Sequence, residues 1–208
     1  TDDATTGGGG VLYVNNGATV LAKDCRFNNN TAFHYGGAIR IQAATVKLEN
    51  CNFTQNYGYE QSSATLNVRG NVIYADNNAN LNIVNSNFVD NHPSTKQGQN
   101  KVADVCYGGV IYINGATVRV YNSNFINNSV TSKNASNIGG VFYVTNGGQL
   151  TINHSSFINN SASKIVGIST STGGVIYATG ANSKVIINDS SFTNNIAKSD
   201  DTRLTYGG

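Results

Sequence analysis

The chain is built from short runs in which apolar and polar residues alternate with a period of two. Two such runs follow each other in every repeat, typified by Val110-Ile111-Tyr112-Ile113 and Thr117-Val118-Arg119-Val120. This period is typical of a β-strand with one buried face. The alternation therefore predicts an all-β chain in which each strand turns one row of side chains inward.

The same pattern recurs six times. A glycine pair followed by apolar residues, replaced once by Gly70-Asn71, opens repeats near residues 9, 36, 70, 108, 139 and 173. After each opening comes a phenylalanine and, three residues later, an asparagine. The phenylalanines are Phe27, Phe53, Phe88, Phe125, Phe157 and Phe192, and the asparagines are Asn30, Asn56, Asn91, Asn128, Asn160 and Asn195.

Strands that return to the same position in every repeat predict a right-handed parallel β-helix of about six coils over residues 1–208. An Asn-Gly pair such as Asn114-Gly115 usually indicates a hairpin, but hairpins would leave the aligned columns without a cause. We expect the phenylalanines to form one internal column. We expect the asparagines to form a ladder at a bend, each bonded to its copies above and below, and to adopt the left-handed backbone of that corner.

The repeats differ most between the asparagine and the next glycine pair. This edge segment is shortest at Thr31–Tyr35 and longest at His92–Tyr107, which holds Lys96 and Lys101. Insertions in a solenoid map to one edge and often form its binding face. Binding is therefore expected in these segments.

A column of aromatic residues is the competing binding site. Tyr74, Tyr112 and Tyr143 share one repeat position, and alternation from the inward residue beside them places them on the outside of the sheet. Such a column is either a surface ladder of stacked strand residues or an exposed strip for sugar rings or another protein.

Two further columns carry candidate chemistry. Cys25 and Cys51 stand two residues before the phenylalanine in consecutive repeats, as buried free thiols or as a disulfide between coils. Asn29, Asn127 and Asn159 begin Asn-x-Ser/Thr sequons just before the ladder asparagine, where a glycan would face solvent. Turn-favouring Ser and Thr after a bend explain that second column equally well.

Composition and charge exclude several function classes. Charged residues make up 12 % of the chain, the net charge is +2 and no basic cluster exists, so we expect no nucleic-acid partner. No apolar run is long enough to cross a bilayer, so this segment is not expected to insert into a membrane. The acidic residues are scattered and the three histidines fall at three repeat positions. We therefore expect no enzyme, cofactor or metal site.

The glycine-pair and Phe-x-x-Asn motifs resemble the repeats of chlamydial polymorphic membrane proteins and of adhesin-like surface proteins of methanogenic archaea. The resemblance covers nearly the whole chain; valine usually replaces alanine after the glycines, and Asn71 replaces one glycine. It implies a surface-displayed β-helix excised from a longer adhesin, with no active site to carry over.

We therefore expect an adhesin or stalk segment at the cell surface or outside the cell. Its edge loops would attach to a protein or glycan on another cell. The alternative is a purely structural spacer or filament subunit, which would self-associate, and a β-helical polysaccharide-degrading enzyme is a distant third.

Overall fold

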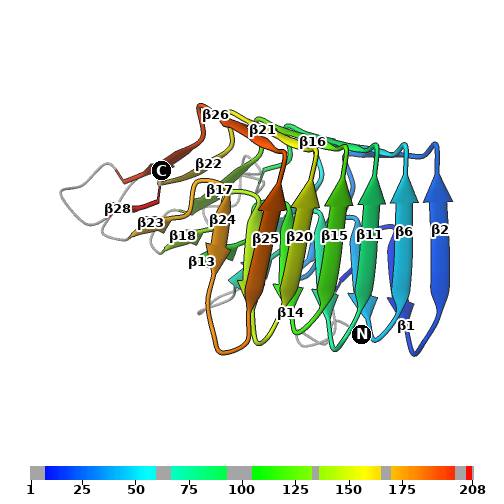
Figure 1. Cartoon of the computed structure of the whole chain (residues 1–208). Coiled ribbons are helices and arrows are strands. Elements are labelled where there is room, and N and C mark those ends of the chain that lie inside the picture. The colour runs from blue at the N-terminus through cyan, green and yellow to red at the C-terminus, as the bar shows by residue number, and fades with distance from the viewer. Residues whose placement is uncertain are drawn as a thin grey trace.

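The computed structural model describes residues 8–59, 67–92, 105–132, 136–164, 170–199 and 205–207. Within these ranges every regular element is a β-strand, and every strand pairing is parallel. The predicted all-β parallel solenoid is confirmed (Figure 1).

Three long sheets run the length of the stack, and each takes one strand from every repeat. Sheet A contains β1 (Leu12–Asn15), β5 (Ile39–Gln42), β10 (Ile73–Asp76), β14 (Ile111–Asn114), β19 (Phe142–Thr145) and β24 (Ile176–Ala178). Sheet B contains β2 (Thr19–Lys23), β6 (Thr45–Glu49), β11 (Asn80–Val84), β15 (Thr117–Tyr121), β20 (Gln149–Asn153) and β25 (Lys184–Asn188). Sheet C contains β3 (Arg26–Asn28), β7 (Asn52–Thr54), β12 (Asn87–Val89), β16 (Asn124–Ile126), β21 (Ser156–Ile158) and β26 (Ser191–Thr193).

Shorter strands form the remaining side of the coils. Sheet D pairs β4 (Thr31–Phe33) with β8 (Tyr57–Tyr59). Sheet F contains β17 (Ser129–Ser132), β22 (Ser161–Lys164) and β27 (Ile196–Lys198). Sheet E contains β9 (Asn67–Arg69), β13 (Val105–Tyr107), β18 (Asn137–Ile138), β23 (Ser171–Thr172) and β28 (Thr205–Tyr206).

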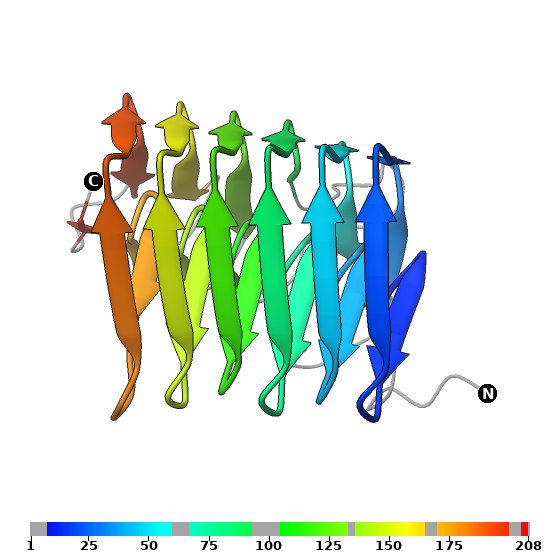
Figure 2. The ribbon, with the colours of Figure 1, turned by 45° about the vertical axis from the view of Figure 1, so that its right-hand side comes forward.

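Equivalent residues of successive repeats lie directly opposite each other. Ile111 pairs with Ile73 on one side and with Phe142 on the other, and Phe125 lies between Phe88 and Phe157. Figure 2 shows the resulting row of coils, each offset from the last by one strand. A hairpin at the Asn-Gly turns is thereby excluded, because each turn joins a strand of sheet A to one of sheet B.

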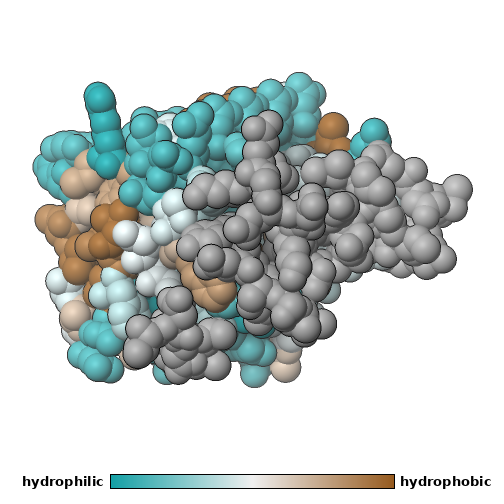
Figure 3. Space-filling model, turned by 180° about the vertical axis from the view of Figure 1, so that it is seen from behind, coloured by the Kyte–Doolittle hydropathy of each residue, from teal (hydrophilic) through white to brown (hydrophobic). Residues whose placement is uncertain are grey.

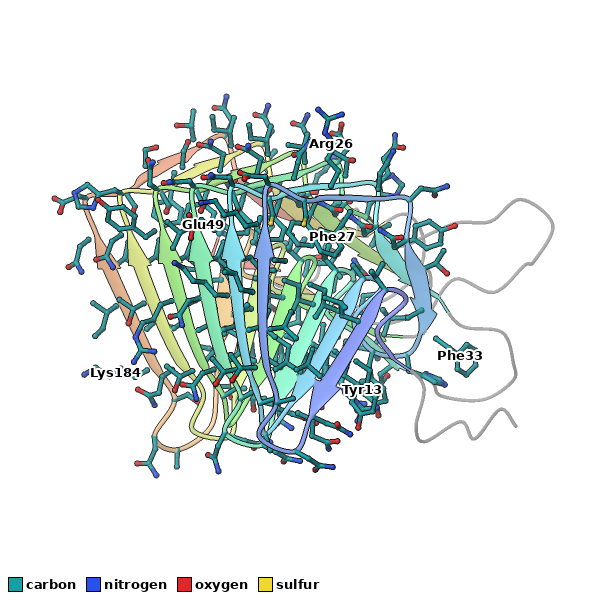
Figure 4. The ribbon with its side chains drawn as sticks, turned by 90° about the vertical axis from the view of Figure 1, so that its right-hand side faces the viewer. Tyr13, Arg26, Phe27, Phe33, Glu49 and Lys184 are labelled. Carbon is teal, nitrogen blue, oxygen red and sulfur yellow. The ribbon has the colours of Figure 1, made fainter. Side chains whose placement is uncertain are left out.

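The core is a stack of equivalent layers, in which the phenylalanine column keeps the same residue in every repeat. The phenylalanine rings lie face to face, with centroids 4.4 to 4.9 Å apart along the whole column. That spacing matches the distance between neighbouring strands in a sheet, so one ring per coil fills the column without a gap. Figure 4 looks at the first coil, with Phe27 inside the sheets and Arg26 and Lys184 outside. The predicted internal column is confirmed, although Phe192 in the last coil is 43 % exposed.

The asparagines form the predicted ladder at the corner after sheet C. Asn91 donates from its backbone N–H and its Nδ2 to the Oδ1 of Asn128, at 3.1 and 2.9 Å. Its Nδ2 also donates to the carbonyl oxygen of Phe53, at 3.0 Å. The same three bonds recur up and down the stack. Each buried amide is therefore satisfied by its own copies.

The left-handed backbone of this corner belongs to the residue before each ladder asparagine. Asn29, Gln55 and Asp90 have φ of 55°, 54° and 54°, and the later repeats follow suit. The expectation that the ladder asparagines themselves take this conformation is wrong. The preceding residue makes the turn, which leaves the asparagine to direct its amide inward.

The glycine pairs lie against the residue that follows the ladder asparagine, and we call this meeting point the waist. A Cβ on Gly140 would overlap the carbonyl oxygen of Gly174 and lie 2.8 Å from the carbonyl carbon of Ser161. Gly36 has φ of +53°, and a Cβ there would overlap the carbonyl oxygen of Ile39. The waist therefore has room for two backbones but no side chain between them.

Asn71 is the one residue that replaces a glycine of these pairs, and the geometry explains why a side chain fits there. Its repeat has no strand after Asn91 in sheet D or sheet F among the described residues. Asn71 is buried, and its Nδ2 donates to the carbonyl oxygen of Ser129 in the next repeat, at 3.4 Å. Its side chain thus occupies space that a backbone fills in the other repeats.

Beyond the waist the edge sheets enclose a second, much smaller core, which we call the edge lobe. It consists of Val68, Cys106, Val130 and Ala162, all fully or almost fully buried. The inner coils are therefore divided into a large lobe, built on the phenylalanine and asparagine columns, and a small lobe enclosed by the edge strands.

The ladder predicts an unequal response to two asparagine substitutions in the same repeat. Asn91→Ala would leave the backbone N–H and Nδ2 of Asn56 without their acceptor, so we expect a loss of about 3–5 kcal/mol in the free energy of unfolding. Asn87 is exposed, and it accepts a bond from Asn124 on the outer face of sheet C. Asn87→Ala should therefore change stability by less than about 0.5 kcal/mol in the same denaturant titration. Equal losses would mean that the ladder is not a buried network.

Candidate functional site

In several repeats the edge segment starts and ends on strands of sheets D, E and F. In the second repeat, β8 leads into the segment and β9 follows it; in the fourth, β17 and β18 do the same. The strands that flank these segments belong to sheets D, E and F, which lie at one side of the stack (Figure 1). The segments between them differ in length from repeat to repeat.

The variable part of the longest edge segment is shorter than the sequence suggested. Cys106 is buried in the edge lobe, and Tyr107 belongs to β13, which pairs with β9 and β18. The end of His92–Tyr107 is therefore scaffold, and the variable stretch is 93–104. Lys96 and Lys101 lie outside the described residues.

The tyrosine column follows the outer face of sheet A. Tyr74, Tyr112 and Tyr143 stack with ring centroids 5.3 and 4.8 Å apart, and Tyr177 continues the stack at 5.3 Å. Arg40 takes the place of a tyrosine in the second coil. Its guanidinium lies 5.2 Å from the ring of Tyr13 and 5.8 Å from that of Tyr74, within the range of a cation–π contact.

The column is covered by residues of the edge side. The Tyr35 ring lies 4.7 Å from that of Tyr74, and the Tyr107 ring lies 5.0 Å from that of Tyr143. Tyr74 and Tyr112 are only 6 % and 9 % exposed. The expectation of an exposed aromatic strip is therefore wrong for these two residues, because the waist folds sheet E back toward sheet A.

Two arginines connect the two sides of this cluster. Arg40 lies with its guanidinium 5.0 Å from the Tyr35 ring. Arg69, which pairs with Tyr35, donates from Nη1 to the Tyr35 hydroxyl at 3.1 Å and lies 5.6 Å from its ring. The cluster can therefore fasten the edge lobe to sheet A through aromatic and cation–π contacts, which makes it a structural joint.

The electrostatics of the joint follow from its burial. Burial, reinforced by the nearby carboxylate of Asp76, raises the pKa of Tyr74 to about 12. Burial also raises the pKa of Tyr112 to about 12, and it raises the pKa of Tyr143 further. For Asp76, burial raises the pKa while the charge of Arg40 acts in the opposite direction.

Sequence reasoning missed the covering residues, although a signal for them exists. Tyr35, Arg69 and Tyr107 each directly precede the glycine that opens the next repeat. A long side chain that recurs directly before such a glycine indicates that the chain turns sharply there. The turn places the long side chain against the outer face of the sheet that follows.

The cysteines are free thiols in this structure. Cys51 is buried and donates from Sγ to the carbonyl oxygen of Ala22 at 3.3 Å, whereas Cys25 is half-buried and donates to that of Lys23 at 3.1 Å. The two thiols contact each other, and burial raises the pKa of Cys51. Of the two interpretations, the structure therefore corresponds to adjacent reduced thiols.

The sequon column is on the surface as expected. Asn29, Asn127 and Asn159 are exposed at the left-handed corner before the ladder, with φ of 55°, 54° and 55°. Their side chains point away from the ladder and are accessible to a glycan. Glycosylation of these three asparagines stays a prediction.

The described part of the chain contains no group of three or more His, Cys, Asp or Glu side chains that could hold a metal ion. Within the same ranges, none of the elements is a helix long and apolar enough to cross a membrane. Asp24 and Asp189 share a corner column but lie in the first and last coils.

Comparison with known proteins finds one family. The Chlamydia polymorphic membrane protein repeat matches residues 24–42 and 154–179. Each match runs from the corner before a stacked phenylalanine, through the ladder asparagine and an edge segment, to the glycine pair and sheet A. The matched motifs are therefore those that build the waist. No curated protein and no solved structure matches the chain, and the likeness to methanogen adhesin-like proteins stays a prediction.

The tyrosine joint predicts a loss of stability at high pH. Tyr74 and Tyr112 ionise near pH 10 when unfolded but near 12 when folded, so their contribution is complete below pH 10 and is lost as the pH rises through 12. We expect Tyr74→Phe and Tyr112→Phe to move the midpoint of alkaline unfolding to higher pH, as followed by circular dichroism. Tyr121, 49 % exposed on sheet B, is the matched control, and Tyr121→Phe should leave the midpoint unchanged.

The cysteines predict three free thiols with different reactivities. Counting thiols on unfolded, unreduced protein should give three, since all are free. On the folded protein, Cys25 should react first with a thiol reagent because it is half-buried. Cys51 and Cys106 are buried and should react only after unfolding. A count of one on unfolded protein would show that two of the three cysteines form a disulfide, which would contradict the structure.

Proposed function

We propose that this chain is a rod segment of a cell-surface adhesin, with binding carried by its edge segments. Two findings support the proposal: the parallel solenoid, and the match of the waist motifs to the Chlamydia polymorphic membrane protein repeat. The solenoid provides a stiff rod whose length grows with the number of coils. The edge provides positions where the sequence can change.

The observation that carries the proposal is the division of each coil at the waist. On the large-lobe side, the phenylalanine column, the asparagine ladder and the glycine pairs repeat the same contacts in every coil. These contacts are buried and similar from coil to coil, so they build the scaffold and do not select a ligand. The edge segments differ most between coils, and loops on a rigid scaffold commonly carry recognition.

Stretch 93–104 is the best candidate for the binding segment. It is the longest, and it begins after buried Asn91 and ends before β13, so both its attachment points are held by the scaffold. Lys96 and Lys101 provide two positive charges. Such charges suit an acidic glycan or an acidic patch on a protein of another cell.

The test compares the intact chain with a variant in which 93–104 is replaced by a short Gly/Ser linker. We expect the unfolding temperature to change by no more than about 2–4 °C, because Asn91 and β13 stay in place. We expect binding to be lost on arrays of immobilised acidic glycans and on cultured cells. Lys96→Ala with Lys101→Ala should weaken the same binding without any change in the scaffold.

The matched control removes 165–169, the part of the fifth edge segment between β22 and β23. Binding that survives this deletion but not the first would locate recognition in 93–104. A chain that binds neither glycans nor cells would favour the alternative, a structural spacer. Substituting the tyrosine column cannot serve as a clean comparison, because Tyr74 and Tyr112 are buried and their loss would destabilise the joint.

A further inference from the structure

The outer face of sheet B gathers basic residues that the sequence keeps far apart. Lys23, Lys47, Arg119 and Lys184 lie on its strands with exposed side chains, and Glu49 is the only acid of these six strands. The sheet faces the viewer in Figure 1, and Figure 4 shows Lys184 pointing away from it. The sequence shows no basic cluster because each of these residues comes from a different repeat, and only the stacking of the coils brings them together.

The cations on this face are regularly spaced. Lys47 pairs with Asn82 and Asn82 with Arg119, so the two cations share one row and lie two coils apart. At the usual distance between strands, this separation is about 9–10 Å. Lys184 follows two coils after Arg119, in the neighbouring row of the same face. The second, fourth and sixth coils therefore each present one cation.

Groups suited to a sugar lie between and beside these cations. Asn82 and Thr151 are half-buried in the row of Arg119, one coil to either side, and offer an amide and a hydroxyl. Tyr121 lies two residues after Arg119 on the same face, is 49 % exposed, and has its ring 5.4 Å from that of His154. An exposed tyrosine ring provides an apolar surface with a polar tip, on which a sugar ring can stack.

We propose that the outer face of sheet B binds a linear polysaccharide that carries one carboxylate on every second sugar. Two sugar rings span about the distance of two coils, so successive carboxylates meet Lys47 and Arg119. The hydroxyls of the sugar between them meet Asn82. The charges on the face and on the polymer are complementary, which favours their encounter.

The spacing of the cations favours a polysaccharide over a nucleic acid. A nucleic acid strand carries a phosphate on every nucleotide, and its affinity depends on the number of phosphates that cations neutralise. With a cation only at every second coil, most phosphates would lie beside Asn82 or Thr151 and would stay without a partner.

Arg119 is the main anchor of the site. Glu49 already shares the charge of its neighbours, since its carboxylate lies 2.8 Å from Nζ of Lys47 and 3.3 Å from Nζ of Lys23. Exposed ion pairs of this kind are weak, so Lys47 can still contribute, but less than Arg119. The acidic residues Asp24 and Asp189 of the adjoining corner belong to the first and last coils, which leaves the middle of the face positive.

The other two long sheets do not offer a comparable face. The tyrosine joint covers the outer face of sheet A, where Tyr74 and Tyr112 are buried. Figure 3 shows hydrophilic residues along the top of the molecule, where sheet C lies, but the strands of sheet C carry a single charged residue, Arg26. The proposed face is also separate from stretch 93–104, which leads into β13 of sheet E.

The experiment measures the binding of a fluorescent hyaluronate decasaccharide, which alternates glucuronate with a neutral sugar, to the intact chain by anisotropy. We expect binding that weakens as the salt concentration rises, and none to a neutral dextran of the same length. Arg119→Gln should weaken binding by about five- to tenfold, Tyr121→Ser by about threefold and Lys47→Gln by about twofold. Arg26→Gln, exposed on sheet C, is the matched control and should change the affinity by less than about twofold. All four side chains are exposed, so thermal unfolding followed by circular dichroism should be unchanged.

Three outcomes would overturn the proposal: no binding by the wild type, equal losses for Arg119→Gln and Arg26→Gln, or tighter binding of single-stranded DNA than of the decasaccharide. The variant with a linker in place of 93–104 should bind the decasaccharide as the wild type does, and a loss there would move the site to the edge. A disaccharide reaches one cation only and should bind at least about tenfold more weakly, so arrays of short glycans report on the edge segments. Failure of the sheet B site would therefore leave adhesion through 93–104 intact.

Discussion

The structure depends on the ladder of asparagine amides at the corner after sheet C. A buried amide must satisfy two donors and an acceptor, and here the copies in the neighbouring coils do so, together with one phenylalanine carbonyl. This arrangement works only if equivalent residues lie directly above one another. The ladder therefore fixes the register of sheets A, B and C, because a slip by one residue would leave every amide unpaired.

The waist also explains why one side of the coil is constant and the other is not. At Gly140 the two backbones leave no room for a Cβ, so the chain must cross there in the same way each time. Beyond this crossing, the apolar core of the edge lobe consists, among the described residues, of four small or medium side chains, and the column of Cys106 continues as buried Asn137 and Ser171. Asn71 shows that the rule is local: its repeat has no strand in sheet D or sheet F among the described residues, and there a side chain fills the waist.

Much of this architecture could be predicted from the sequence because residues that recur at the same position of every repeat form a column in the stack. The positions of Phe125 and Asn128 recur in every repeat, and a column of one residue type needs one environment. Alternation also identified correctly which side of sheet A Tyr74 faces. It could not show that Tyr35 covers that side, because alternation describes one sheet and burial depends on its neighbours. The left-handed corner was misplaced by one residue for a related reason: Asn29 and Asn30 are chemically identical, and only the hydrogen bonds separate their roles.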